Sequence, residues 1–323
     1  MKLTATSLAI GVAFCHAHAM AAAPAVRETR VPGADGVSLY VRTVGEQGPV
    51  VVAPFANLHG KQLDALGESA RLVLFDPRGR GRSDAVTPDK VSLDHLLRDY
   101  AAVQDWTGAS SIVLIGWSGA GMETFVYTLR NPGRVSRLVQ LAPIGPRAKP
   151  YGDAMMQDRG KRTDQTARTA LVERYRKGEY KDRGAALCRE VFLVDTLATL
   201  ADPSTLARLP DVCDSPNEWP ESTGPYFTAL LASLGDFDWR PDLASVRIPR
   251  LVIHGEQDNI PLAASREWVA GVPEARLMIV PRSGHWPQYE APDLAIGAIR
   301  EFIAGNWPAA AKTVESPAVS AGD

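Results

Sequence analysis

The sequence predicts an α/β protein with a mostly parallel central sheet, helices on both faces, and a helical cap inserted between two strands. Short apolar runs alternate with segments whose apolar residues recur every three or four positions. Such alternation is typical of a parallel sheet covered by helices. It stops between about residues 146 and 242, where the chain is charged and helix-patterned. That interruption predicts the insertion.

Six short apolar runs, most bounded by Gly, Pro or Asp, have the composition of buried parallel strands. They span residues 50–53, 72–75, 112–115, 138–141, 251–253 and 277–280. Between them, apolar residues at helical intervals predict amphipathic helices over residues 94–106, 122–130, 263–269 and 294–303. Strand and helix therefore follow each other along most of the chain.

The interruption also predicts how the chain divides. We expect a cap subdomain over residues 146–242, which later become rich in Pro and aromatic residues, and a core built from residues 20–145 and 243–307. The stretch 308–323 is rich in Ala, Ser and Pro and lacks apolar periodicity. This composition predicts a disordered tail.

The first 19 residues have the pattern of an export signal. Lys2 precedes the short apolar run Leu3–Phe14, and Ala17-His18-Ala19 offers a cleavage site, so the mature chain would begin near Met20. A lipoprotein signal would use Cys15, but Phe14 is not the small residue that such a signal requires before its cysteine. We expect a periplasmic or secreted protein. The run is too short for a membrane span, which needs about 20 apolar residues.

The composition limits the expected binding partners and predicts the redox state of the cysteines. The formal net charge is -2 and there is no basic cluster, so nucleic acid is not an expected partner. Without Cys15, the mature chain keeps two cysteines, Cys188 and Cys213, both within the expected cap. In an oxidising compartment this pair predicts a disulfide; the alternative is two separately buried thiols.

The segment around Ser118 predicts a nucleophile. Residues 112–115 form an expected strand, Gly116-Trp117-Ser118-Gly119-Ala120 follows, and a helix is expected from about Met122. A nucleophilic serine on a sharp strand-to-helix turn needs small residues two positions before and after it. Gly116 and Ala120 meet that need. The alternative is a glycine-rich turn that only connects two elements.

A serine hydroxyl needs a base and a residue that orients the base, in the order Ser, Asp, His for this arrangement. His285 lies in the loop after the last expected strand and is the best candidate base. Asp258 lies in the loop after the preceding strand and is the candidate acid, with Glu256 as a local competitor. His254, at a strand end, is expected to pack, and His95 to face solvent.

With these residues in place, the sequence resembles the α/β-hydrolase superfamily over nearly the whole mature chain. Residues 76–84, DPRGRGRSD, match a turn of that family, and residues 284–292 resemble its C-terminal histidine motif. Within the superfamily, residues 238–255 resemble the proline-iminopeptidase-like and aryl-esterase-like group. The resemblance implies an α/β-hydrolase fold and a Ser118, Asp258, His285 triad.

One loop departs from the family pattern. The family usually has His-Gly after the strand equivalent to 50–53, whereas this sequence has Pro54-Phe55-Ala56-Asn57, and His59-Gly60 comes later. The backbone N–H groups expected to form the oxyanion hole are that of Gly119 and that of Phe55 or Ala56, because proline has none to donate.

These residues predict a serine hydrolase that cleaves a carboxylic ester through an acyl-enzyme on Ser118. Alternatives are a proline-iminopeptidase-like aminopeptidase or amidase acting on short peptides, then haloperoxidase-like, lactonase or C–C bond hydrolase chemistry, and lastly a non-catalytic binding protein. No His/Asp/Cys cluster has metal-ligand spacing and no organic cofactor is implied.

The expected substrate is a small-molecule ester or short peptide. Trp117 and Trp286 are the expected substrate contacts. Cap aromatic residues would form an apolar wall or pack the cap, and an aminopeptidase would need a cap carboxylate for the substrate ammonium group. The aromatic candidates are Tyr226, Phe227, Phe237 and Trp239, and the carboxylate candidates are Glu173, Glu190, Asp195, Glu218 and Glu221.

Overall fold

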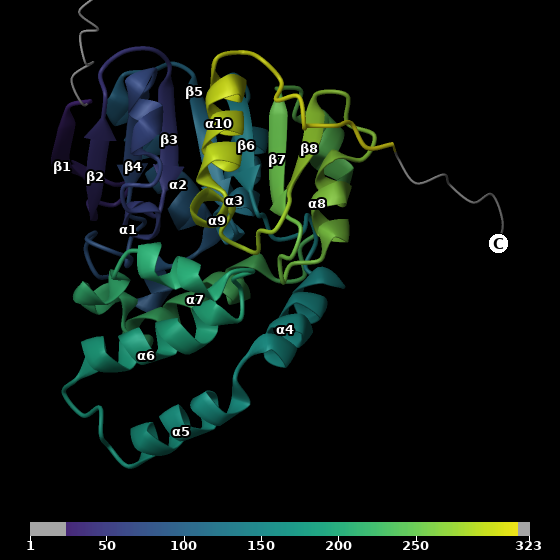
Figure 1. The fold of residues 1–323 in the computed structure, drawn as a ribbon. Helices are drawn as coiled ribbons and strands as arrows, with labels where there is room; N and C mark the ends of the chain where they lie inside the picture. The colour runs from purple at the N-terminus through teal and green to yellow at the C-terminus, as the bar shows by residue number, and fades with distance from the viewer. Residues whose placement is uncertain (1–23, 316–323) are drawn as a thin grey trace, which may run out of the picture.

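A computed structural model describes residues 24–315. An eight-stranded sheet, ordered β1-β2-β4-β3-β5-β6-β7-β8, forms its centre (Figure 1). β2 pairs antiparallel with both β1 and β4, and every other neighbouring pair is parallel. The strands are β1 Val26–Pro32, β2 Ser38–Val44, β3 Val50–Pro54, β4 Arg71–Phe75, β5 Ile112–Trp117, β6 Val135–Leu141, β7 Arg250–Gly255 and β8 Ala275–Val280.

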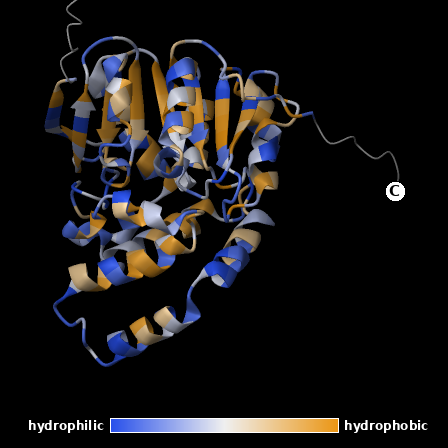
Figure 2. Cartoon of the chain, viewed as in Figure 1, coloured by the Kyte–Doolittle hydropathy of each residue, from blue (hydrophilic) through white to orange (hydrophobic). Residues whose placement is uncertain are grey.

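Helices cover both faces of this sheet. The helices are α1 Ala56–His59, α2 Leu93–Thr107, α3 Gly119–Arg130, α4 Tyr151–Arg162, α5 Gln165–Arg176, α6 Gly184–Leu197, α7 Pro220–Leu234, α8 Leu262–Val269, α9 Pro287–Glu290 and α10 Pro292–Ile303. Figure 2 shows mostly hydrophobic strands between helices of mixed hydropathy. Because side chains alternate across a strand, Val52 joins the apolar core on the α2, α3 and α8 face, and Val51 joins the core on the α10 face.

The cap lies between β6 and β7 in the sequence and contains α4 to α7. Figure 1 shows these helices together beyond one end of the sheet, with α5 farthest from it. At the base of the cap, Arg147 and Asp238 form an antiparallel bridge, which brings the two ends of the insertion together. The structure therefore confirms the predicted α/β fold with an inserted helical cap.

The six predicted strands and the four predicted core helices are all present, with ends shifted by up to three residues. β1 and β2 were not predicted. β1 is almost entirely exposed and polar, with the sequence VRETRVP, so it lacks the apolar run used to recognise buried strands. β2 is buried but includes Ser38, Arg42 and Thr43, which interrupt the apolar pattern.

The expectation of a disordered tail is wrong for residues 308–315. Ala311 is buried against the core on the α10 face, the Lys312 N–H donates to the Leu277 carbonyl at 2.8 Å, and Val314 bridges to Ala270. The segment lies beside the edge strand β8, which offers unpaired backbone groups. The predicted signal peptide, and residues 316–323 of the tail, lie outside the described residues.

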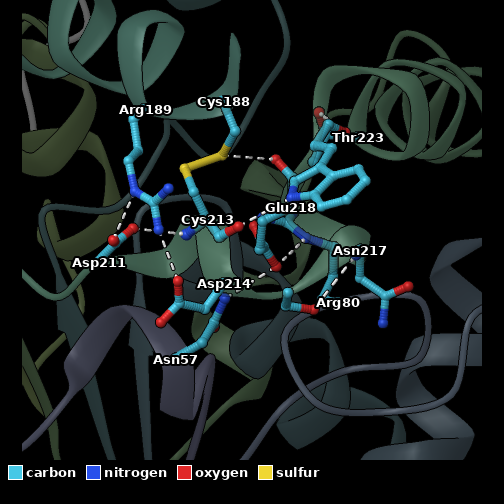
Figure 3. Close-up of a disulfide and its surroundings, with 12 residues drawn as sticks. Asn57, Arg80, Cys188, Arg189, Asp211, Cys213, Asp214, Asn217, Glu218 and Thr223 are labelled. Carbon is cyan, nitrogen blue, oxygen red and sulfur yellow. Dashed lines mark hydrogen bonds and ion pairs between the residues drawn. A yellow bond between two sulfur atoms is a disulfide. The ribbon is translucent and has the colours of Figure 1, made fainter. Parts of the chain in front are cut away.

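The predicted disulfide between Cys188 and Cys213 is present (Figure 3). It joins α6 to the 3-10 turn Val212–Asp214. Both cysteines are buried in a small apolar cluster with Val212, packed against Leu58, Phe192 and Trp219. The bridge therefore ties two separate segments of the cap together beside the core loop that carries Leu58. No helix within residues 24–315 is long and apolar enough to cross a bilayer.

Candidate active site

Ser118 occupies a sharp turn between β5 and α3. Its φ of 55° and ψ of -123° are strained for a residue with a side chain. The turn closes tightly, because a Cβ at Gly116 would lie 2.3 Å from the Ala120 carbonyl oxygen. Ala120 itself is accommodated and buried. The strand, turn and helix predicted around the serine are thus all present.

The structure brings the three predicted residues into one chain of hydrogen bonds. His285 Nε2 lies 2.9 Å from Ser118 Oγ, and His285 Nδ1 lies 3.1 Å from each carboxylate oxygen of Asp258. The Asp258 side chain is fully buried, and its Oδ1 also accepts the Ile260 N–H at 2.9 Å. The carboxylate is therefore fixed by backbone and faces the imidazole with both oxygens.

The competing residues lie elsewhere. Glu256 Oε2 accepts the Arg282 N–H at 3.2 Å and makes no contact with the imidazole. His254 is buried, with Nδ1 2.9 Å from Ser265 Oγ, which agrees with its expected packing role. Asp258 is therefore the acid that meets His285.

Trp117 and Trp286 both line the space above Ser118, but they also hold the histidine loop. Trp117 Nε1 donates to the His285 carbonyl at 2.9 Å, and the two indole rings pack with centroids 4.2 Å apart. Trp286 Nε1 donates to Thr199 Oγ1 at 3.0 Å. The His285 N–H donates to the Thr199 carbonyl at 2.9 Å. The cap thus contacts the histidine loop directly, which the sequence did not indicate.

The loop after β3 leaves two backbone donors unused. Phe55 has a left-handed conformation (φ 63°), and its carbonyl accepts the Leu58 and His59 N–H groups at 2.9 and 3.0 Å. The Asn57 N–H donates to Asp76 Oδ1 at 2.7 Å. Among the described residues, the N–H groups of Phe55 and Ala56 have no acceptor, and the same holds for Gly119. These are the donors predicted from the sequence.

Asp76 holds the loop after β3 in place through hydrogen bonds to its carboxylate. Its carboxylate also accepts the Arg82 N–H at 2.9 Å, and it is completely buried. Burial raises the pKa of Asp76 to about 6, although the Arg82 and Asn57 N–H groups act in the opposite direction. The conformation of the loop that carries Phe55 thus depends on a buried carboxylate.

A cavity of about 470 Å³ opens above Ser118, between core and cap. Its core-derived walls are Leu58, Arg80, Trp117, Ser118, His285 and Trp286; its cap-derived walls are Arg159, Cys188, Val191, Phe192, Asp195, Thr196, Thr199, Val212, Glu218, Pro220, Thr223, Gly224 and Phe227. Of the expected cap aromatics, only Phe227 lines it. Tyr226, Phe237 and Trp239 instead pack with the core cluster on the α2 face.

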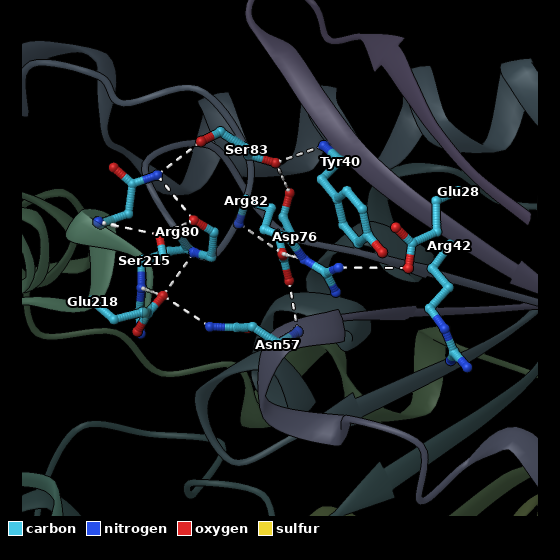
Figure 4. Close-up of polar contacts among 12 residues, drawn as sticks. Glu28, Tyr40, Arg42, Asn57, Asp76, Arg80, Arg82, Ser83, Ser215 and Glu218 are labelled. Carbon is cyan, nitrogen blue, oxygen red and sulfur yellow. Dashed lines mark hydrogen bonds and ion pairs between the residues drawn. The ribbon is translucent and has the colours of Figure 1, made fainter. Parts of the chain in front are cut away.

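Arg80 and Glu218 form a buried ion pair between core and cap, shown in Figure 4. Arg80 Nη2 and Nε donate to Glu218 at 2.6 and 3.1 Å. Burial works against both charges, but each group favours the charged form of the other, so the pKa of Glu218 is lowered and that of Arg80 is raised. In the sequence, Arg80 belongs to the turn of residues 76–84 that resembles one of the α/β-hydrolase family, and nothing there indicates that its side chain lines the cavity.

Within residues 24–315, no group of three or more His, Cys, Asp or Glu side chains is arranged to hold a metal ion.

Residues 54–292 match the sequence model of the family described as alpha/beta hydrolase fold. The match includes Ser118, Asp258 and His285 and covers most of the chain. The chain belongs to the α/β-hydrolase fold family.

The chain is also similar in sequence to two hydrolases that are named for 2-hydroxy-6-oxo substrates. The chain is 27% identical over 247 residues to the 2-hydroxy-6-oxononadienedioate/2-hydroxy-6-oxononatrienedioate hydrolase of Escherichia coli. This similarity covers 76% of this chain and 80% of that enzyme. The chain is 25% identical over 276 residues to the 2-hydroxy-6-oxo-6-phenylhexa-2,4-dienoate hydrolase of Burkholderia cepacia, covering 85% of each. Both of these relatives are hydrolases.

Among solved structures, the chain is similar to the esterase EaEST from Exiguobacterium antarcticum, with a TM-score of 0.65 and 20% identity. The similarity covers 86% of this chain and 100% of the esterase. At this identity the likeness concerns the fold, which the two proteins share.

Proposed function

We propose that this α/β-hydrolase is a serine hydrolase that cleaves a carboxylic ester through an acyl-enzyme on Ser118. The observation that carries the proposal is the chain of hydrogen bonds from Asp258 through His285 to Ser118, which opens into the cavity between core and cap. Nucleophile, base and orienting acid are within bonding distance, as acyl transfer requires.

In the proposed mechanism His285 Nε2 takes the proton of Ser118 as Oγ attacks the acyl carbon. The oxyanion accepts hydrogen bonds from the free N–H of Gly119 and from that of Phe55 or Ala56, each contributing about 3 kcal/mol of barrier lowering. Asp258 holds the imidazole in one tautomer and stabilises the imidazolium. His285 then protonates the leaving alkoxide, and water repeats the sequence to release the acid.

The cavity gives less support to an aminopeptidase. A substrate ammonium group needs a carboxylate with free oxygens, and the two carboxylates that line the cavity are Asp195 and Glu218. Glu218 is engaged by Arg80, and Asp195 by Arg159 and Arg168. The resemblance to the proline-iminopeptidase-like group therefore stays a prediction from the sequence alone.

Carbon–carbon bond hydrolysis is the second candidate, favoured by the names of the two relatives at 25–27% identity. Both reactions can use the same serine, so the substrates separate them. We expect turnover of short p-nitrophenyl esters to exceed that of prolyl arylamides and of 2-hydroxy-6-oxo-dienoates. A preference for the dienoates by tenfold or more in kcat/KM would replace ester hydrolysis with the second candidate.

The nucleophile is tested separately. A fluorophosphonate probe should label the wild-type protein and leave Ser118→Ala unlabelled. Labelling that persists in Ser118→Ala, or no labelling of a folded wild type, would remove Ser118 from its proposed role.

We also propose that the protein is exported to the periplasm or beyond. The support is the signal-like pattern of residues 1–19 and a disulfide in the cap, since disulfides persist in oxidising compartments. Cell fractionation with N-terminal sequencing should find a mature chain beginning near Met20. A full-length chain in the cytoplasm would contradict export.

A further inference from the structure

The charged side chains that line the cavity differ in how completely they are hydrogen-bonded. Apart from His285, they are Arg80, Arg159, Asp195 and Glu218. Both carboxylates are held by arginine, whereas each arginine has a buried nitrogen with no partner among the described residues: Arg80 Nη1 and Arg159 Nε. The buried atoms of these four side chains that lack any hydrogen-bond partner are therefore both donors.

Both carboxylate oxygens of Glu218 already accept hydrogen bonds. Its Oε1 accepts from Asn57 Nδ2 at 2.9 Å, from the Gly81 N–H at 2.7 Å and from Arg80 Nε at 3.1 Å. Its Oε2 accepts from Arg80 Nη2 at 2.6 Å. Figure 4 shows the carboxylate between Arg80 and Asn57. The pair is thus oriented so that two arginine nitrogens face Glu218 and the third does not.

The remaining nitrogen, Arg80 Nη1, is held in place by aromatic rings. The arginine side chain is 6% exposed, and its guanidinium carbon lies 5.4, 5.3 and 4.9 Å from the ring centroids of Phe55, Tyr226 and Phe227. A buried N–H of a charged group that lacks an acceptor is costly. A group in the cavity that accepts a hydrogen bond would remove this cost.

We propose that Arg80 is a substrate-binding residue whose Nη1 holds a carboxylate of the substrate, separate from the acyl group that Ser118 attacks. The substrate class is then an ester that carries a second, ionised carboxyl group. This proposal rests on the ester hydrolysis proposed above and names the substrate of the same site.

Charge favours a carboxylate over a neutral acceptor. Hydrogen bonds from arginine to a carboxylate are roughly twice as strong as those between neutral groups. The charges of the two arginines and the two carboxylates that line the cavity balance, so the lining carries no excess negative charge that would repel an anion. Phe55 belongs to the loop with the free N–H groups, so the anion would lie near the reacting carbonyl group.

Matched esters test this. One series varies the acyl part: the mono-p-nitrophenyl ester of adipic acid, its terminal amide, and p-nitrophenyl heptanoate. A second series varies the alcohol part: 4-(butanoyloxy)benzoate and 4-(butanoyloxy)benzamide. In each, the readout is the ratio of kcat/KM for the carboxylate to kcat/KM for its amide or apolar analogue.

Three variants separate binding from folding. Replacing Arg80 alone would leave Glu218 buried without its partner, so the test uses Arg80→Met/Glu218→Gln, which removes both charges. Glu218→Gln alone keeps Arg80 and removes its competing anion. Arg82→Met, whose side chain is half-exposed in the same turn, is the matched control. Fluorophosphonate labelling of Ser118 and the thermal midpoint report whether each variant is folded.

In at least one series we expect the carboxylate ratio to fall about 10- to 100-fold in Arg80→Met/Glu218→Gln. In Glu218→Gln it should rise roughly threefold or more, because the opposing charge is gone. Arg82→Met should leave it within about twofold. If the Arg80–Glu218 pair had only a structural role, the carboxylate ratio would change in the same direction in Glu218→Gln and in Arg80→Met/Glu218→Gln.

Equal ratios in wild type and Arg80→Met/Glu218→Gln for both series would overturn the proposal, as would an amide that behaves like the carboxylate. If heptanoate is hydrolysed without any carboxylate effect, ester hydrolysis stands and the role of Arg80 falls. If no ester is hydrolysed, calorimetric titration of Ser118→Ala with monomethyl adipate, with and without the Arg80 and Glu218 changes, decides the role of Arg80 alone. Binding at least tenfold weaker without Arg80 would support it, and equal binding would refute it.

Discussion

Removing the Cys188–Cys213 bridge should destabilise the protein by an amount that follows from its place in the chain. The two cysteines are 25 positions apart. A cross-link that closes such a loop lowers the entropy of the unfolded chain, which corresponds to about 3.5 kcal/mol at 25 °C. The disulfide lies in an apolar cluster beside the cavity, so we also expect kcat/KM for a short ester to fall when it is broken.

Urea unfolding of the mature protein, followed by circular dichroism with and without a reductant, measures this effect. We expect reduction to lower the free energy of unfolding by about 3 to 4 kcal/mol. Cys188→Ala/Cys213→Ala should unfold at similar urea concentrations with or without reductant, which controls for effects of the reagent itself. A change below about 1 kcal/mol on reduction would refute the reasoning, because loop closure alone predicts more.

Three further predictions follow from buried polar groups. Asp258→Asn should lower kcat by about 10⁴-fold without unfolding the protein, because an amide N–H facing His285 selects the wrong tautomer. Steady-state kinetics on a variant with an unchanged circular dichroism spectrum would check this, and a loss of kcat below tenfold would contradict it. Arg250→Met should raise the free energy of unfolding by about 1–3 kcal/mol, since Arg250 is fully buried and its three guanidinium nitrogens have no hydrogen-bond partner among the described residues; urea unfolding that shows a loss of stability would contradict this. Because burial raises the pKa of Asp76 from 3.8 to about 6, its contribution to stability is greatest below pH 3.8 and is lost as pH rises through 6, by about 3 kcal/mol; the difference in unfolding free energy between wild type and Asp76→Asn should show this dependence, and a constant difference from pH 4 to 7 would refute it.

The strands β3 to β8 and the residues Ser118, Asp258 and His285 were predictable because each has a local signal. Buried parallel strands such as β5 are continuous apolar runs, and the Ser118 turn demands small neighbours that appear in the sequence. His285 and Asp258 follow because loops after parallel strands end at one edge of the sheet. Each of these signals lies within a few positions of the residue or strand that it identifies.

The remaining parts depend on contacts between distant segments. Arg80 and Glu218 are 138 positions apart, and nothing in the DPRGRGRSD turn distinguishes Arg80 from Arg82, one buried and the other half-exposed. The cap aromatics show the same limit, because Phe227 lines the cavity while its neighbour Tyr226 packs below it. The periodicity of apolar residues predicts which face of a helix is buried, but not which other segment that face contacts.

The contacts of Thr199 restrict how the cap can move. Its carbonyl and hydroxyl oxygens accept hydrogen bonds from the backbone of His285 and from the indole of Trp286, so a cap that swung open at this point would break two contacts of the loop that carries the base. We therefore expect the cap to stay in place over the cavity during turnover, and the substrate to enter from the side of the cap. A hollow between α5 and α6 shares Val191, Asp195 and Pro220 with the cavity. A substrate that entered from this hollow would leave the hydrogen bonds between Thr199 and the histidine loop unbroken during each turnover.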